Sequence, residues 1–178
     1  SRVNVAEVRL YQGRAAQAVE ELERVLPLLR AAYGGDHVRV ASCLHTLGEG
    51  LARQRRLREA MEVHRRELDV WVHAVGSDHP YVADALMSIG ELELEQRSPK
   101  EALQPLRRAL RLYEGGRFAN ETANAQFLLA RALWDSSGDP TETCDLAGRA
   151  RQRLAEAGKL HRLELEQIER FLAAHGCP

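Results

Sequence analysis

The chain has 178 residues, of which 44% are hydrophobic but only 5% aromatic, and 25 basic and 26 acidic side chains give it a net charge of −1. This length fits one domain whose core is built mainly from leucine, alanine and valine. The balanced charge argues against a nucleic-acid or anionic-membrane surface, since both need a basic excess. No apolar run approaches the roughly 20 residues that cross a bilayer.

The cysteines and the start of the chain bear on its cellular context. Cys43, Cys144 and Cys177 are an odd, widely spaced set without a Cys-x-x-Cys pair. They indicate three free thiols in a reducing compartment rather than a disulfide framework. No signal-peptide pattern opens the sequence, so we expect a cytoplasmic protein. Because the chain runs straight into a helical pattern from Ser1, we also expect it to be a piece of a longer polypeptide.

Helical periodicity predicts nine helices in succession. Glycine closes the long ones, at Gly34-Gly35, Gly76 and Gly115-Gly116. Pro27 lies inside the second helix and is expected to kink it or to remove a hydrogen bond. The predicted ranges are about 3–11, 15–33, 37–54, 57–74, 79–96, 99–114, 120–134, 141–157 and 160–174.

A period of 42 residues organises these helices. Gly76–Tyr113 aligns with Gly34–Trp71 when it is shifted back by 42 residues. A fixed period of this length indicates a solenoid. We therefore predict a single all-α domain over residues 1–178. It is a right-handed superhelical solenoid of about four antiparallel helix pairs, in units of about 1–35, 36–77, 78–117 and 118–158. A helix at 160–175 with a polar outer face caps the stack.

Small residues within each unit identify the type of repeat. Gly48 precedes Ala60 by 12 residues, and Gly90 precedes Ala102 by 12. A small residue on each helix of a pair lets the two backbones approach where they cross. This pattern resembles the tetratricopeptide repeat, and Gly76–Ala83 (GSDHPYVA) resembles its kinesin-light-chain-like subclass. The resemblance implies a non-catalytic protein-interaction module that holds a protein or peptide in its concave groove.

A second resemblance concerns context. The array together with the final segment 168–175 (IERFLAAH) looks like the C-terminal region of large bacterial serine/threonine protein kinases, notably those of myxobacteria. That likeness implies the regulatory or docking region of a bacterial signalling protein. The chain itself has no Gly-rich loop, HRD-type catalytic loop or DFG motif, so we do not expect an enzyme.

The resemblance also implies which side chains line the groove, on the first helix of each pair. The kinesin-light-chain type carries an Asn-Asn pair there, and this chain has His45-Thr46 and Met87-Ser88 instead, so only the groove is carried over and not its specificity. Acidic residues predominate in the middle, which favours a partner segment with basic and apolar residues. The predicted groove residues are Ser42, His45, Glu49, Arg53, Asp84, Met87, Ser88, Glu91, Glu95, Asn124, Phe127, Arg131 and Trp134, with Thr46, Asp135, Glu7, Leu10 and Tyr11 beside them.

Several histidines, one cysteine and three arginine runs could in principle form metal, catalytic or nucleic-acid sites. His37 and His79 each follow an aspartate, but they lie 42 residues apart at the same point of successive repeats. They are expected to cap loops rather than to converge on one metal ion. His64 is expected to be a packed histidine and Cys43 a core thiol. The arginine runs at 53–58, 107–111 and 149–153 fit solvated helix faces better than a nucleic-acid or acidic-peptide site. We predict no cofactor, metal or catalytic residue.

An alternative function is self-association. The first helix presents Val3, Val5, Val8 and Leu10, which we expect to form an exposed apolar face able to pair two copies of the chain. A homodimer formed through this face is the alternative to partner docking in the groove.

Overall fold

The computed structural model describes residues 2–114, 118–157 and 161–177, and these form α-helices without any strand. The all-α prediction is confirmed, and the helix boundaries agree with the predicted ones to within two residues. None of the helices in these ranges is long and apolar enough to cross a membrane. The helices are α1 (Arg2–Tyr11), α2 (Ala15–Tyr33), α3 (Val38–Arg53), α4 (Leu57–Val75), α5 (Pro80–Glu95), α6 (Pro99–Tyr113), α7 (Ala119–Asp135), α8 (Pro140–Ala157) and α9 (Arg162–Ala174).

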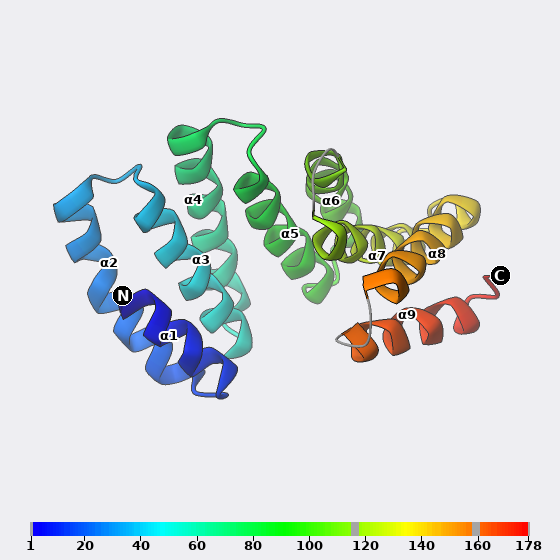
Figure 1. Ribbon diagram of the computed structural model, residues 1–178, viewed down its shortest axis with the longest axis horizontal. Helices are drawn as coiled ribbons and strands as arrows, with labels where there is room; N and C mark the ends of the chain where they lie inside the picture. Colours follow the sequence, from blue (N-terminus) through cyan, green and yellow to red (C-terminus); the bar gives the residue numbers. More distant parts are fainter. Residues whose placement is uncertain (1, 115–117, 158–160, 178) are drawn as a thin grey trace. The chain divides into compact units, whose positions relative to one another are not determined.

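The chain divides into two compact units, one ending at Leu92 and the other beginning at Glu93, so the boundary falls inside α5. In the first unit α1 packs on α2, α2 on α3 and α3 on α4. In the second unit α6 packs on α7, α7 on α8 and α8 on α9 (Figure 1). Within each unit these helices therefore pack mainly on their neighbours in sequence, as expected for a helical repeat array.

Small residues set the distance between paired helices in the first unit. Ala6, Ala18 and Ala60 have no exposed surface. Gly48 lies so close to α4 that a Cβ atom placed on it would be 2.4 Å from Nε2 of His64. Gly48 of the predicted small-residue pair thus leaves room for the His64 side chain of α4, and Ala60 of the same pair is fully buried.

Local hydrogen bonds start the helices of successive repeats in the same way. Nδ1 of His37 accepts a hydrogen bond from the backbone N–H of Arg39 at 3.1 Å, and Nδ1 of His79 accepts one from Tyr81 at 3.2 Å. The prediction that these two histidines cap loops is confirmed.

The helix ends follow the glycine pattern where the structure describes them. Gly34 and Gly76 end α2 and α4 with φ of 88° and 91°, a backbone conformation that favours glycine. The predicted end at Gly115-Gly116 lies outside the described residues. Helix α2 continues through Pro27, so this proline does not divide it.

The cysteine prediction is wrong for two of the three residues. Cys144 on α8 forms a disulfide with Cys177, which follows α9, and their Cα atoms are 5.3 Å apart. Only Cys43 is a free thiol, and it is buried. The two partners are 33 residues apart in sequence, and they meet because α9 folds back along α8. The cysteines therefore give no support to a reducing compartment.

The last helix packs with one face only. Ile168 and Leu172 are buried, whereas Glu164, Glu169 and Arg170 are exposed. Helix α9 thus has the polar outer face predicted for a helix that ends the stack.

Gly48→Ala should destabilise the chain by about 1–3 kcal/mol, because the added methyl group must displace the buried ring of His64. Gly148→Ala is the matched control, since no atom lies within 4 Å of the added carbon on α8. It should be neutral or stabilise by up to about 1 kcal/mol through helix propensity. Urea unfolding of both variants measures the difference, and equal effects would refute the close approach at Gly48.

Thiol counting tests the disulfide. Burial raises the pKa of Cys43 to about 11, although the charge of Arg30 opposes this, so the native oxidised chain should react negligibly with a maleimide at neutral pH. After denaturation one thiol should react without a reductant and three with it. Three reactive thiols in the oxidised, denatured chain would show that Cys144 and Cys177 are not joined.

Candidate functional site

The predicted groove residues fall into two sets, one in each unit. In the first unit α3 and α5 carry them, and the two helices share a core in which Leu47 and Leu51 lie with Ile89 and Leu92. All eight residues of this set reach the surface at least in part, namely Ser42, His45, Glu49, Arg53, Asp84, Met87, Ser88 and Glu91. These side chains form what we call the α3–α5 face.

Two residues predicted to line the groove lie in the core instead. Thr46 is only 5% exposed, and its hydroxyl donates to the carbonyl of Ser42, one turn earlier on α3. Leu10 is 2% exposed and belongs to the core of the first unit. Tyr11, by contrast, is exposed, and the guanidinium of Arg53 lies 5.9 Å from its ring centre.

In the second unit the predicted aromatic residues contact the chain's own last helix. Phe127 on α7 meets Phe171 edge to face at 5.6 Å, and Trp134 lies 3.9 Å from the ring of His175. Arg131 lies 6.0 Å from the ring of Phe127. Asn124 and Glu95, the remaining members of this set, are exposed. Helix α9 and its end thus cover part of the surface that the sequence assigned to a partner.

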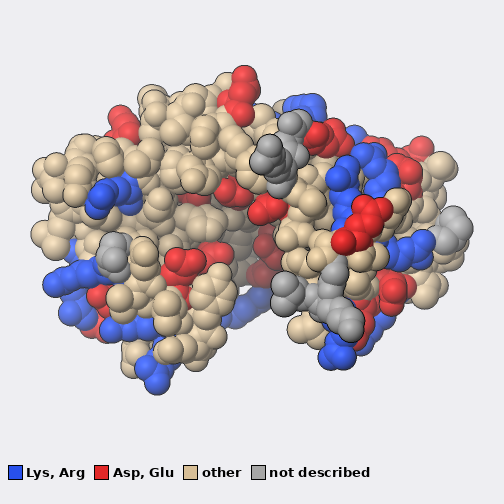
Figure 2. Space-filling view, viewed as in Figure 1, with Lys and Arg blue, Asp and Glu red and all other residues tan. Residues whose placement is uncertain are grey.

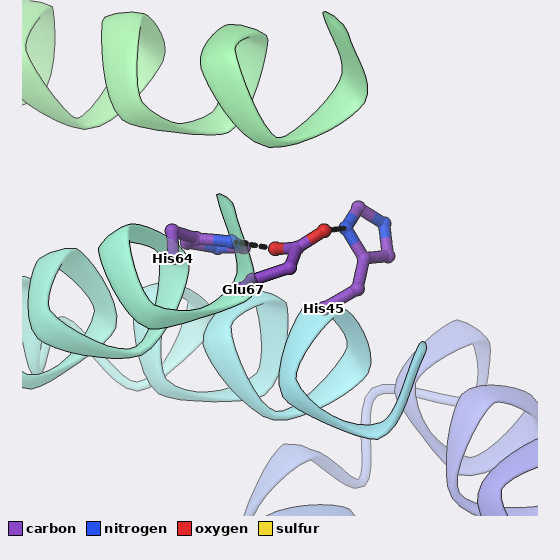
Figure 3. A group of neighbouring side chains, drawn as sticks. All are labelled: His45, His64 and Glu67. Carbon is purple, nitrogen blue, oxygen red and sulfur yellow. Dashed lines mark hydrogen bonds and ion pairs between the residues drawn. The ribbon is translucent and has the colours of Figure 1, made fainter. Parts of the chain in front are cut away.

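A buried polar cluster lies at the edge of the α3–α5 face. Glu67 on α4 has no exposed surface, and its two carboxylate oxygens contact Nδ1 of His64 at 2.7 Å and Nδ1 of His45 at 3.0 Å. Figure 3 shows both imidazole rings turned toward this carboxylate. The indole N–H of Trp71 donates to the same carboxylate at 3.2 Å. Three donors from two helices therefore satisfy one buried anion.

The electrostatics of the cluster favour the charged forms of Glu67 and His45. Burial opposes the ionised form of Glu67, but hydrogen bonds from His45 and His64 keep its pKa below the usual value. Burial alone would lower the pKa of His45, yet the hydrogen bond and charge of Glu67, with the charges of Glu49 and Asp84, raise it to about 9. Nε2 of His45 lies 3.7 Å from Glu49. At neutral pH His45 is therefore a cation held among three carboxylates.

Sequence reasoning missed this cluster because it did not single out Glu67 and treated His64 only as a packed histidine. The 42-residue register contained the signal: Glu67 aligns with Val25 in the preceding repeat and Ala109 in the next. Both of those residues are buried and apolar. A carboxylate at such a position must find partners inside the core.

The arginine runs form surface ion pairs. Arg56 pairs with Glu59 at 2.6 Å, Arg107 with Glu142 at 2.7 Å, and Arg149 with Glu114 at 3.3 Å. On the face drawn in Figure 2, basic and acidic side chains lie next to each other on each unit. Such exposed pairs contribute little stability, and they fit the solvated helix faces that the sequence analysis preferred.

Comparison with known proteins supports the repeat assignment. The family model described as tetratricopeptide repeat matches residues 1–71 and 51–115. A candidate kinesin light chain of Podosopora anserina with nearly identical TPR-like repeats superposes with a TM-score of 0.78 at 18% identity, over 98% of this chain and 83% of that one. BtubC (BKLC) of P. vanneervenii gives a TM-score of 0.79 at 18% identity, over 88% of this chain and 63% of that one. At this identity the likeness shows the fold alone. No curated protein matches the chain.

The pKa shifts predict how stability depends on pH. The pKa of His45 is raised from 6.5 to about 9, so its contribution is fully present below pH 6.5 and is lost as the pH rises through 9. We therefore expect the wild type to exceed His45→Gln in unfolding free energy by a margin that narrows between these values. Urea unfolding at several pH values, with a chelator present, measures that margin. A constant margin would contradict the charged state of His45.

Proposed function

The chain belongs to the tetratricopeptide repeat family, and we propose that it uses the α3–α5 face of its first unit to dock a protein or peptide segment. The repeat fold supports a protein–protein interaction scaffold, and the family is generally non-catalytic. Helix-borne side chains on one face of such an array can grip an extended or helical segment. We propose both the face that binds the partner and the kind of partner segment that this face selects.

The charge of the α3–α5 face carries the proposal. Glu49 on α3 and Asp84 on α5 both act on His45, which places these two carboxylates near the same imidazole. Glu91 is exposed farther along α5, and Met87 adds a partly exposed apolar side chain between them. A partner segment with lysine or arginine beside apolar residues complements this face, whereas an acidic segment is repelled.

The wider context is also part of the proposal. The likeness of segment 168–175 to the end of bacterial serine/threonine kinases supports a regulatory or docking region of a bacterial signalling protein. The catalytic domain of such a protein lies outside this sequence. Free thiols no longer support the predicted cytoplasmic location, because Cys144 and Cys177 form a disulfide.

Self-association through α1 is the second candidate. Val5, Val8 and Tyr11 are 48%, 53% and 78% exposed, and together they give α1 an apolar outer surface. Val3 and Leu10 do not belong to it, because both pack into the core of the first unit. Val5 and Val8 of the expected apolar face are therefore exposed, and Tyr11 lies beside them in place of Val3 and Leu10.

Charge reversal tests docking at the α3–α5 face. A display library of random peptides is selected against the whole chain, and the enriched peptides should be basic and apolar. Asp84→Lys/Glu91→Lys should weaken their binding at least about tenfold, or about 1.4 kcal/mol, and added salt should weaken the wild-type complex. Fluorescence anisotropy gives both affinities.

The control is a second double variant that replaces two acidic residues with lysine on a different surface. Glu62→Lys/Asp69→Lys alters two exposed residues of α4 and should leave the affinity within about twofold of the wild type. Equal losses in both double variants would mean that only net charge matters, and the proposed face would be rejected. A mass that rises with concentration in sedimentation runs, without peptide enrichment, would favour self-association instead.

A further inference from the structure

The buried cluster of His45, His64 and Glu67 is not required by the repeat fold. The 42-residue register aligns these positions with Val3, Leu22 and Val25 in the preceding repeat, and with Met87, Leu106 and Ala109 in the next. Leu22, Leu106 and Ala109 have no exposed surface, and Val25 is 6% exposed. Apolar residues therefore occupy these places in the repeats on both sides of the cluster.

The fold does not require the buried, ionised carboxylate of Glu67, so its presence needs another explanation. Removing a carboxylate from water carries a desolvation penalty of several kcal/mol, and apolar residues of similar volume often serve stability equally well or better. Only the second repeat combines two imidazoles and a carboxylate at these positions. We propose that His45, His64 and Glu67 bind a divalent transition-metal ion of the zinc class.

The donor atoms suit such an ion. Two imidazole nitrogens and one carboxylate oxygen are ligands that zinc prefers, and three protein ligands leave a further coordination position open. The ligand atoms of the three residues all lie within 4.8 Å of one another. Tetrahedral zinc bonds of about 2.0–2.2 Å separate ligand atoms more widely than the 2.7 Å and 3.0 Å contacts of Glu67 with His64 and His45. The ion must therefore enter between them and displace the Nδ1 protons of both histidines to solvent. The partly exposed His45 side chain can rotate to follow the ion, whereas the buried His64 and Glu67 side chains must move slightly apart.

The surrounding residues hold the ligands in orientation. The indole of Trp71 donates to Glu67 at 3.2 Å, which fixes the carboxylate. The ring of His64 lies against Gly48, which leaves its Nδ1 facing Glu67. Glu49 lies 3.7 Å from Nε2 of His45, where it can accept a hydrogen bond once Nδ1 binds the ion. Metal-ligating histidines usually have such an outer carboxylate or carbonyl partner.

The cluster is also open to solvent on one side. Glu67 and His64 are buried, but the His45 side chain is 35% exposed. An ion can therefore reach the three ligands from the α3–α5 face by way of His45. The carboxylates of Glu49 and Asp84, which already act on His45, favour the arrival of a cation.

Calorimetry with metal salts tests the proposal. The whole chain, free of any histidine tag and treated with a chelator, is titrated with zinc chloride. We expect one ion per chain at micromolar affinity or tighter, and an upward shift of the melting temperature with added zinc. Cobalt(II) at the same site should give a visible absorption band of low-coordinate cobalt. Absence of zinc binding at micromolar concentrations would overturn the proposal.

Three variants locate the site. His45→Gln removes the partly exposed ligand and should weaken zinc binding at least about tenfold. The triple variant His45→Met/His64→Leu/Glu67→Ala copies the next repeat, so it should remain helical and bind no zinc. His79→Gln alters a histidine outside the cluster and should bind as the wild type does.

Each outcome of this series is decisive. Zinc binding by a folded triple variant, or equal affinity in His45→Gln and the wild type, would show an adventitious cation site elsewhere and overturn the proposal. If the triple variant fails to fold, Glu67→Gln replaces it, because the amide keeps the shape of the carboxylate and loses its charge. Wild-type affinity in Glu67→Gln would then overturn the proposal.

Discussion

The geometry of the buried polar cluster depends on the contact between Gly48 on α3 and the ring of His64 on α4. With no Cβ at Gly48, the imidazole fills the crossing of the two helices, and a side chain there would meet it at 2.4 Å. That contact fixes the direction of Nδ1 of His64, which in turn holds Glu67 at 2.7 Å. Gly48 therefore leaves the space that the His64 ring fills, and so helps to set the geometry of the buried carboxylate.

The buried carboxylate connects the core of the repeat to its surface. Its first oxygen contacts the partly exposed His45, and the charges of Glu49 and Asp84 reach the same imidazole. A change in the charge or position of His45 therefore acts on the core through Glu67 and on the α3–α5 face through its two acidic neighbours. The next repeat, with Met87 and Leu106 at the matching places, has no such connection.

The periodicity of the sequence predicted the fold well because helices, their ends and their caps depend on the spacing of nearby residues. The 42-residue register, the glycine ends and the His37 and His79 caps all depend on residues close together in sequence. The Cys144–Cys177 disulfide and the contact of α9 with α7 involve residues far apart, so spacing could not reveal them. Glu67 is intermediate. Its alignment with Val25 and Ala109 and its spacing from His64 and Trp71 on α4 are features of the sequence, but its contact with His45 arises only where α3 packs on α4.

The position of α9 limits where a partner can dock. Phe171 and His175 already contact Phe127 and Trp134, the aromatic side chains that the sequence offered to a ligand. A partner that used those rings would have to displace α9, whose end is tied to α8 by the disulfide. The α3–α5 face needs no such displacement within its own unit. This difference in accessibility, together with the carboxylates near His45, is the physical reason to seek the partner on the first unit.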